Sequence, residues 1–530
     1  MSNYQDNKKM KLKKYITICG VTSALLSLTS CNDFLSTLPD NRAEVKGPED
    51  VRSLLITAYP EKLYSMYCEY SSDNVVHNVE ADANTKPFYD QIYAWEDITE
   101  TDNDDPRGTW ESCYGAIQTA NAALEIIEKA GNPANLQAQK GEALLCRAFN
   151  HFVLVNVFAE AYDATTAANK LGVPYNTRPE TTLKPTYTRE SIAGNYEHIA
   201  KDIEEGLPLI SDNSYSVPKY HFNKKAAEAF AARFYLYYQK WDLAKKYASQ
   251  VLGSNVKGLL RDYDALLALP SGSDGFKNRA LKFIDPSNAN NLLLIASYSG
   301  LGRIYGFYTI GARYTHSDFV AAKETVEAPN AWGSTELKLK GEHVQEPYRK
   351  ILFPRYPEQF EITDRIAGTG YLRTTQVEFT TDETLLIKAE AEIMLGEKDA
   401  ALADMNAYLS NTYSGQVELT EQKIKTWNKE TKYSTPQLPT PRKQLNPSWT
   451  ITPEQEEYLQ VLLHLRRIET VHTGLRWFDV KRYGIEITRV DVSDGSKVTV
   501  TSNVLKKDDK RRALQLPADV ITAGLAPNRK

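Results

Sequence analysis

Apolar side chains recur at steps of three and four residues between positions 105 and 158, and this period predicts α-helix. The first helical face comprises Trp110, Cys113, Tyr114, Ile117, Asn121, Leu124 and Ile127. From about Leu136 to Phe158 the residues are apolar nearly all round, which indicates a buried helix. A chain that contains these two long segments is predicted to form a mostly α-helical fold.

The ends of the first helix carry their own signals. Asp105 before Pro106 is typical of an N-cap followed by the first helical position, and Gly131-Asn132-Pro133 predicts the end. Further helices are predicted at 188–206, 224–238, 241–253, 381–395, 398–410 and 452–472. The helical period fades in residues 255–380 and 411–451, which are predicted to form loops with a few short strands.

Two of the predicted helix pairs share a pattern typical of tetratricopeptide-type helical hairpins. Ala232 precedes Ala244 as Ala389 precedes Ala401, with a tight turn that contains a charged residue between them. Small side chains let two helix backbones approach closely, and Tyr247 with neighbouring rings is expected to fill the groove. The copies do not recur at a steady period of about 34 residues, so they predict dispersed hairpins in a larger body rather than a solenoid.

The N-terminus has the three parts of a secretory signal: five lysines between positions 8 and 14, an apolar stretch from Tyr15 to Leu28, and small residues before Cys31. The apolar stretch is shorter than the roughly 20 residues that a membrane-spanning helix needs. Leu28-Thr29-Ser30-Cys31 resembles the bacterial lipobox. We therefore predict a signal peptide over 1–30 and a mature chain, 31–530, that carries lipid on Cys31. An ordinary secretory signal is the alternative, and translation from Met10 would leave the same mature protein.

Charge and cysteine content argue against a nucleic-acid-binding protein and against a disulfide-rich scaffold. Without five lysines and one aspartate of the signal, 58 basic and 67 acidic residues remain, so a basic nucleic-acid surface is not predicted. Cys68, Cys113 and Cys146 have scattered positions, which favours free buried thiols, although one disulfide remains open. The 32 tyrosines suit either a protein core or the stacking of sugar faces.

Catalytic and metal-binding motifs are not found. The chain has no HExxH, CxxC or GxSxG pattern and no glycine-rich phosphate loop, so neither a metal nor a cofactor is predicted. The acidic run Glu100–Asp105 lacks the glycine and closing glutamate of a calcium-binding EF-hand loop. We predict that the protein is not an enzyme; because 68 acidic residues are present, a surface glycoside hydrolase remains the alternative.

Six motifs, in order along nearly the whole mature chain, resemble those of the SusD/RagB-like family of nutrient-binding outer-membrane lipoproteins. They are Cys31-Asn32-Asp33-Phe34-Leu35, Trp110-x3-Tyr114-x2-Ile117-x3-Asn121, Gly141-Glu142-Ala143-x3-Arg147-Ala148-Phe149-x2-Phe152, Arg189-x-Ser191-Ile192-x3-Tyr196, Gly474-Leu475-Arg476-Trp477-Phe478-Asp479 and Arg512-Ala513-Leu514-Gln515-Leu516-Pro517. The chain departs from the family in a polar insertion, Ala159–Leu171, and in a tail without the usual aromatic end.

The resemblance implies a single SusD-like body. Its helical hairpins would lie mainly within 105–253 and 381–484, and an irregular ligand-binding lobe mainly within 65–104, 255–380 and 411–451. Family members lie as a lid on a TonB-dependent, SusC-like transporter and deliver oligosaccharides, or peptides in some branches, and none is known as an enzyme. The motif residues themselves are expected to be structural, with Arg476 and Asp479 paired on one helix and Trp477 and Phe478 in the core.

The ligand site is therefore expected in loops that a rigid scaffold holds. Two regions, Ser71–Trp95 and Ser297–Trp332, combine aromatic rings with polar groups and correspond to the family's ligand-gathering lobe. Trp95 and Trp332 are predicted to stack on sugar faces, and Tyr298 or Tyr305 to add a third ring. The hydroxyl partners are predicted to be Asp73, Asn74 and Arg303; Tyr93 and Tyr308 lie in the same regions.

Lipid attachment at Cys31 is directly testable. Cys31→Ala should release the protein from membranes, because each buried CH₂ of an acyl chain contributes about 0.8 kcal/mol and the mutant has no acyl chain there. Metabolic labelling with palmitate checks this, and a mutant that is still labelled would contradict the lipobox assignment.

Overall fold

The computed structural model describes residues 48–81, 86–182, 186–270, 272–339, 341–344 and 348–529. The chain divides into a short unit, Met1–Asp50, and a large unit, Val51–Lys530. The predicted signal peptide and Cys31 lie outside the described residues, so the structure does not bear on them. None of the described helices combines the length and the apolar character that crossing a bilayer requires.

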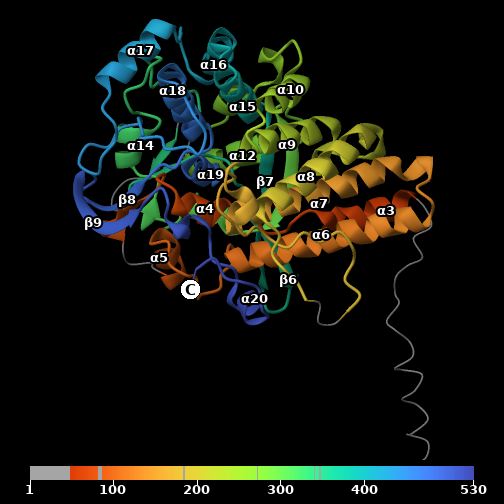
Figure 1. The fold of residues 1–530 in the computed structure, drawn as a ribbon. Coiled ribbons are helices and arrows are strands. Elements are labelled where there is room, and N and C mark those ends of the chain that lie inside the picture. The colour runs from red at the N-terminus through yellow and green to blue at the C-terminus, as the bar shows by residue number, and fades with distance from the viewer. Residues whose placement is uncertain are drawn as a thin grey trace, which may run out of the picture. The chain divides into compact units, whose positions relative to one another are not determined.

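The long predicted helices are confirmed. α6 spans Pro106–Lys129 and α7 spans Gln137–Phe158; the Asp105 side chain caps α6 by accepting from the amide of Gly108 at 2.5 Å. α7 is buried along almost its whole length and contacts α6 on one side and α8 on the other, as the ribbon shows (Figure 1). The remaining helices predicted from the sequence are α8 (Ile192–Gly206), α9 (Lys224–Tyr237), α10 (Trp241–Leu252), α15 (Thr381–Met394), α16 (Lys398–Thr412) and α18 (Pro453–Glu469).

The two helical hairpins form as expected. α9 with α10 and α15 with α16 are antiparallel neighbours, and α10 also packs on α15 (Figure 1). Ala232, Ala244, Ala389 and Ala401 are all fully buried at these contacts. Tyr247 stacks on Tyr235 with ring centroids 5.5 Å apart, so a ring fills the groove between α9 and α10.

Three small sheets accompany the helices in the described residues. The first has the order β3-β1-β8-β9, the second β2-β7-β6, and the third pairs β4 with β5. The strands are β1 (Val76–Asn78), β2 (Asn291–Tyr298), β3 (Tyr314–Thr315), β4 (Glu342–Val344), β5 (Lys350–Leu352), β6 (Gln359–Asp364), β7 (Thr369–Thr380), β8 (Ile487–Ser493) and β9 (Lys497–Leu505). In the second sheet both pairings are antiparallel, so β2 and β6 flank β7.

The irregular segments contain more helix than the sequence predicted. The additional helices are α3 (Pro48–Leu55), α4 (Ser65–Ser71), α5 (Pro87–Tyr93), α11 (Tyr263–Leu267), α12 (Gly272–Phe283), α13 (Leu301–Ile304), α14 (Asp318–Glu324), α17 (Glu421–Glu430) and α20 (Ala518–Thr522). The helix predicted to carry Arg476 and Asp479 is α19 (Leu475–Arg482). Most of the additional helices are too short for an apolar period to appear, and tertiary packing stabilises such helices. The β8–β9 hairpin was also not predicted, although Asp494-Gly495 at its turn is a strong hairpin signal.

The pair predicted between Arg476 and Asp479 is wrong. Arg476 extends away from its own helix and binds Asp73, with Nε 2.7 Å from Oδ1 and Nη2 2.9 Å from Oδ2. Asp479 instead accepts from Arg466 and Arg482 in a fully buried ionic cluster with Glu390. Arg476 finds its carboxylate far along the chain, whereas Asp479 pairs with Arg482, three residues on, and with Arg466 of α18. All three guanidinium groups are buried and need carboxylates. Trp477 and Phe478 are buried, as predicted.

One buried ionic contact joins the helical scaffold to the second sheet. Arg233 of α9 donates to Glu378 of β7 at 2.5 Å and to both carboxylate oxygens of Glu383 in α15, at 3.0 and 2.5 Å. Tyr64 donates to the same Glu378 at 2.8 Å. Cys68, Cys113 and Cys146 are free and buried, so the alternative of a disulfide among them is not realised.

Candidate functional site

A surface of exposed rings lies on the second sheet. Register pairs Tyr298 of β2 with Arg373 of β7, and Arg373 with Gln359 of β6. Paired residues share a face and alternate residues of one strand point the same way, so Tyr371 lies on this face too. Tyr298 and Tyr371 meet edge to face with centroids 5.6 Å apart, and the Arg373 guanidinium lies 4.2 Å from the Tyr298 ring centroid.

A second group of rings and charged side chains lies on α13 and the loop that follows it. Arg303 donates from Nε to Oε1 of Glu358 at 2.8 Å, and Glu358 directly precedes β6. Glu358 raises the pKa of Tyr308, chiefly through a hydrogen bond between the two side chains. Phe307, next to Tyr308, packs on Phe276 of α12 at 5.3 Å. We call the set Tyr298, Arg303, Phe307, Tyr308, Glu358, Tyr371 and Arg373 the aromatic surface.

The rings of this surface are accessible and its charged groups are already paired. Tyr371, Tyr308 and Phe307 are 55%, 42% and 40% exposed. Burial acts to raise the pKa of Glu358, but hydrogen bonds from Tyr308 and Arg303 lower it overall. Flat rings between ion-paired guanidinium and carboxylate groups offer stacking faces together with hydrogen-bond donors and acceptors, as a hydroxylated, uncharged ligand requires.

The predicted site residues divide into two groups. Tyr298 and Arg303 belong to the aromatic surface, but Trp95 and Trp332 are only 4% and 2% exposed and Tyr305 is buried. Our expectation that these three rings are exposed is therefore wrong. The Trp95 indole donates to the carbonyl of Ser71 at 2.8 Å, Trp332 packs on Tyr413 and His464, and Tyr305 stacks on His472 at 4.1 Å.

Asp73 and Asn74 lie in a buried polar cluster. Burial acts to raise the pKa of Asp73, but Arg467 and Arg476 hold it well below its usual value. Asn74 accepts from Arg467 at 2.9 Å and donates to Glu69 at 3.0 Å. These contacts fasten the segment after α4 to α18 and α19, which is a structural role. Ligand binding by either residue remains a prediction, since Asp73 still lines an open hollow of about 510 Å³ and Trp95 another of about 470 Å³.

The acidic run before α6 is engaged by protein groups. Asp102 pairs with Lys86 at 2.6 Å, Asp104 accepts from the amide of Gly300 at 2.8 Å, and Asp105 caps α6. Across the described ranges, no group of three or more His, Cys, Asp or Glu side chains is placed to hold a metal ion. The geometry therefore gives no support to a calcium site in this run.

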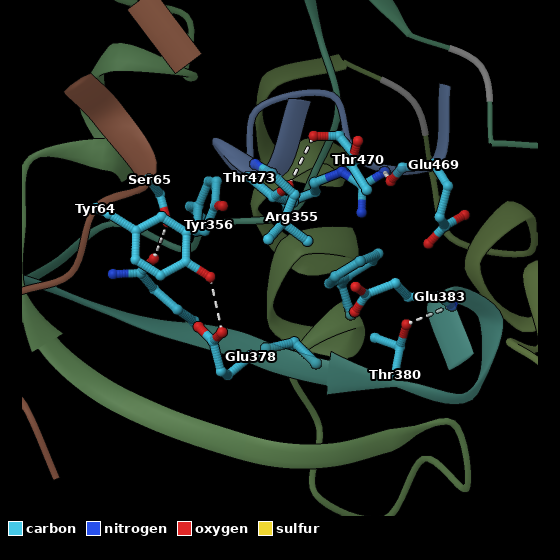
Figure 2. A pocket seen from close by; sticks show the side chains of 14 residues that line it. Tyr64, Ser65, Arg355, Tyr356, Glu378, Thr380, Glu383, Glu469, Thr470 and Thr473 are labelled. Carbon is cyan, nitrogen blue, oxygen red and sulfur yellow. Dashed lines mark hydrogen bonds between the residues drawn. The ribbon is translucent and has the colours of Figure 1, made fainter. Parts of the chain in front are cut away.

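A polar cavity of about 40 Å³ lies in the interior, beside the contact that joins α9 to β7 (Figure 2). Tyr64 donates to Glu378 at 2.8 Å and Ser65 to Gln376 at 2.6 Å on one side, and Arg355 donates to the carbonyl of Glu469 at 2.5 Å on the other. This volume admits a few water molecules but no sugar ring. The cavity is therefore structural, and the aromatic surface is the better candidate for ligand binding.

Comparison with known proteins agrees with the fold and the sequence motifs. A family model of SusD-like proteins, described as "Starch-binding associating with outer membrane", matches residues 33–236. A curated SusD-like protein from Formosa agariphila is 24% identical over 262 residues, which cover 46% of this chain and 47% of the relative; the match thus spans about half of that relative's length.

Solved structures match over nearly the whole chain. A SusD superfamily protein from Bacteroides thetaiotaomicron has a TM-score of 0.63 at 18% identity, covering 92% of this chain and all of that one. A laminarin-binding SusD-like protein has a TM-score of 0.54 at 16% identity, covering 91% and 99%. At this identity the structural matches establish the fold. Residues 33–236 match the SusD-like family model, and the fold of the chain matches that of SusD superfamily structures.

Sequence reasoning missed four residues of the aromatic surface in this SusD-like protein: Phe307, Glu358, Tyr371 and Arg373. Residues 369–377 do carry a strand signal, because every second residue (Tyr371, Arg373, Thr375 and Val377) would lie on the same face of a strand. That alternation predicts a strand, but the ring of Tyr371 is identified as exposed only once β2 and β6 are known to flank it.

Substitution separates core rings from surface rings. Trp95→Ala should lower the free energy of unfolding by about 3–5 kcal/mol, because it leaves a cavity beside Arg489 and Ser71. Tyr371→Ala, the exposed control, should change it by no more than about 0.5 kcal/mol. Denaturant unfolding of both variants measures the difference, and an unchanged stability in Trp95→Ala would contradict its place in the core.

Proposed function

We propose that this SusD-like protein binds an oligosaccharide at the aromatic surface. The observation that carries the proposal is the group of exposed rings, Tyr371, Tyr308 and Phe307, held between ion-paired arginine and glutamate side chains. The description of the family as starch-binding and the laminarin-binding neighbour both support a glucan as the first ligand to test.

The paired charges favour an uncharged ligand over the alternatives. A charged peptide would find the arginines and glutamates of this surface already paired with one another. A glycoside hydrolase needs one carboxylic acid with a raised pKa, whereas the pKa of Glu358 is lowered and Glu361 is paired with Arg373. A peptide ligand and a hydrolytic activity therefore rank below non-catalytic sugar binding.

Ring stacking should supply much of the affinity. Each sugar–protein hydrogen bond replaces one with water and contributes only about 0.5–1.5 kcal/mol. Burying C–H surface against a ring contributes roughly 25 cal/mol per Å². Because the sheet and the loop after α13 already hold the rings in place, little ordering cost opposes these gains.

Loss of one ring should therefore weaken binding measurably. Tyr371→Ala should reduce the affinity for laminarin oligosaccharides by about 1–3 kcal/mol, by analogy with base stacking on aromatic side chains. Titration calorimetry gives the affinity, and Tyr220→Ala, an exposed tyrosine outside the aromatic surface, is the control. Unchanged affinity in both Tyr371→Ala and Tyr298→Ala would remove this surface from the site, and a peptide and glycan array on residues 32–530 would show whether peptides bind instead.

We further propose that the protein is anchored in the outer membrane through Cys31, faces outward, and delivers its ligand to a SusC-like, TonB-dependent transporter. The family description, which associates these proteins with the outer membrane, supports the location. The resemblance supports the partner, and the helical hairpins α9–α10 and α15–α16 are the surface through which we expect it to dock.

The docking surface can be tested with two exposed leucines. Leu395 follows α15 at the tip of a hairpin, whereas Leu281 lies on α12 in the other lobe. Leu395→Asp should weaken association by about 1.5–3 kcal/mol, the value of burying one leucine, and Leu281→Asp should not. Co-purification from native membranes in mild detergent measures this; recovery of the wild-type lipoprotein alone would count against the partner.

A further inference from the structure

The ammonium group of Lys350 lies inside a ring of four backbone carbonyls. Its Nζ atom donates at 2.7, 3.1, 3.1 and 3.0 Å to the carbonyl oxygens of Ile304, Gly306, Tyr308 and Ile310. These are alternate residues of one loop, so the backbone curls around Nζ with every second carbonyl facing inward. The lysine is 1% exposed.

This cation has carbonyl dipoles for partners instead of an acid. Burial lowers the pKa of Lys350 to about 7, and in the described part of the chain no acidic side chain offsets that effect. Four acceptors face the three protons of one ammonium group, a coordination like that of a potassium ion among carbonyl oxygens. The four contacts favour the charged form and compensate the amine for its lost hydration.

The loop depends on the ammonium group at its centre because regular secondary structure does little to stabilise it. α13 is one turn long, and the residues after it form no regular helix or strand. The backbone is also tightly wound: a Cβ added at Gly306 would lie 2.5 Å from the carbonyl oxygen of Gly302, and Gly311 has a φ of +75°. Converging carbonyls repel one another unless a cation lies between them.

The lysine itself is held by strands. Lys350 begins β5, pairs with Val344 of β4, and forms a bridge with Ser317. Its neighbour Ile351 donates to the carbonyl of His316 at 2.9 Å. The backbone from which the lysine side chain extends is therefore held independently of the loop that surrounds the ammonium group.

We propose that these four carbonyls form a cation site that the protein's own Lys350 occupies, and that this occupancy positions Phe307 and Tyr308 in the aromatic surface. Lys350 is thus a positioning residue, because it touches the loop backbone and not the ligand. The effect on ligand affinity rests on the function proposed above, whereas the effect on the loop does not.

Removal and chemical replacement of the side chain test the proposal. In Lys350→Ala, hydrogen exchange of the amides in residues 301–312 should become at least about tenfold faster, roughly the ratio that one lost hydrogen bond produces. Added n-propylammonium, which reproduces the deleted atoms, should restore slow exchange. Tetramethylammonium has no N–H donors and should not.

Matched measurements keep the outcomes distinct. Lys323→Ala removes an exposed lysine of nearby α14 and should leave exchange in 301–312 unchanged. Unchanged exchange in Lys350→Ala would overturn the proposal, as would equal restoration by both cations. If Lys350→Ala does not fold, acetylation of the wild-type protein decides: Lys350 should resist the reagent while Lys323 reacts, and equal rates would overturn the site.

The ligand readout is kept separate. Affinity for laminarin oligosaccharides should fall about tenfold in Lys350→Ala and recover with n-propylammonium, since one ring contact carries roughly that much. Faster exchange without any sugar binding in the wild-type protein would refute the proposed function and leave the cation site standing. Normal exchange with normal sugar binding in Lys350→Ala would overturn the cation site and leave the proposed function standing.

Discussion

The buried contact of Arg233 with Glu378 and Glu383 is the constraint on which the arrangement of helices and sheet depends. One guanidinium group joins α9, β7 and α15, and it is sealed from water with both of its carboxylate partners. Removing either side would leave a buried charge unpaired, which is among the most costly defects in a protein interior. The packing of the helical hairpins on the second sheet is therefore favourable only when Arg233 meets both carboxylates, and this fixes the position of β7.

The aromatic surface takes its rigidity from that position on one side and from Lys350 on the other. β7, the strand whose Glu378 binds Arg233, carries Tyr371 and Arg373. The loop around Lys350 carries Phe307 and Tyr308. The ion pair of Arg303 with Glu358 bridges the two parts. If the proposed ligand gains little from each hydrogen bond, rings that are already in place lower its ordering cost, and Arg233 and Lys350 would contribute to affinity in this way without touching the ligand.

The helical scaffold could be predicted from the sequence far better than the site. α6, α7, α9 and α15 have long apolar periods, α6, α9 and α15 also have a capping side chain at the N-terminus, and such signals are local. The aromatic surface depends on which strands flank β7, on the partner of Glu358 and on the carbonyls that meet Lys350, all of which are contacts between distant residues. Arg476 shows the same limit: a partner three residues away is visible in the sequence, but Asp73, the partner it binds, is not.

The abundance of tyrosine has a structural explanation that composition alone conceals. Many of these hydroxyls are buried against carboxylates: Tyr64 donates to Glu378, Tyr408 to Glu469 and Tyr483 to Glu390, all at 2.7–2.8 Å. A buried carboxylate needs donors, and a tyrosine supplies one together with a ring that fills space, without adding a second charge. The excess of rings thus reflects the ionic interior, including the contact at Glu378, more than it reflects sugar stacking. Rings available to a ligand are distinguished by exposure, and Tyr371 is identified by its open face.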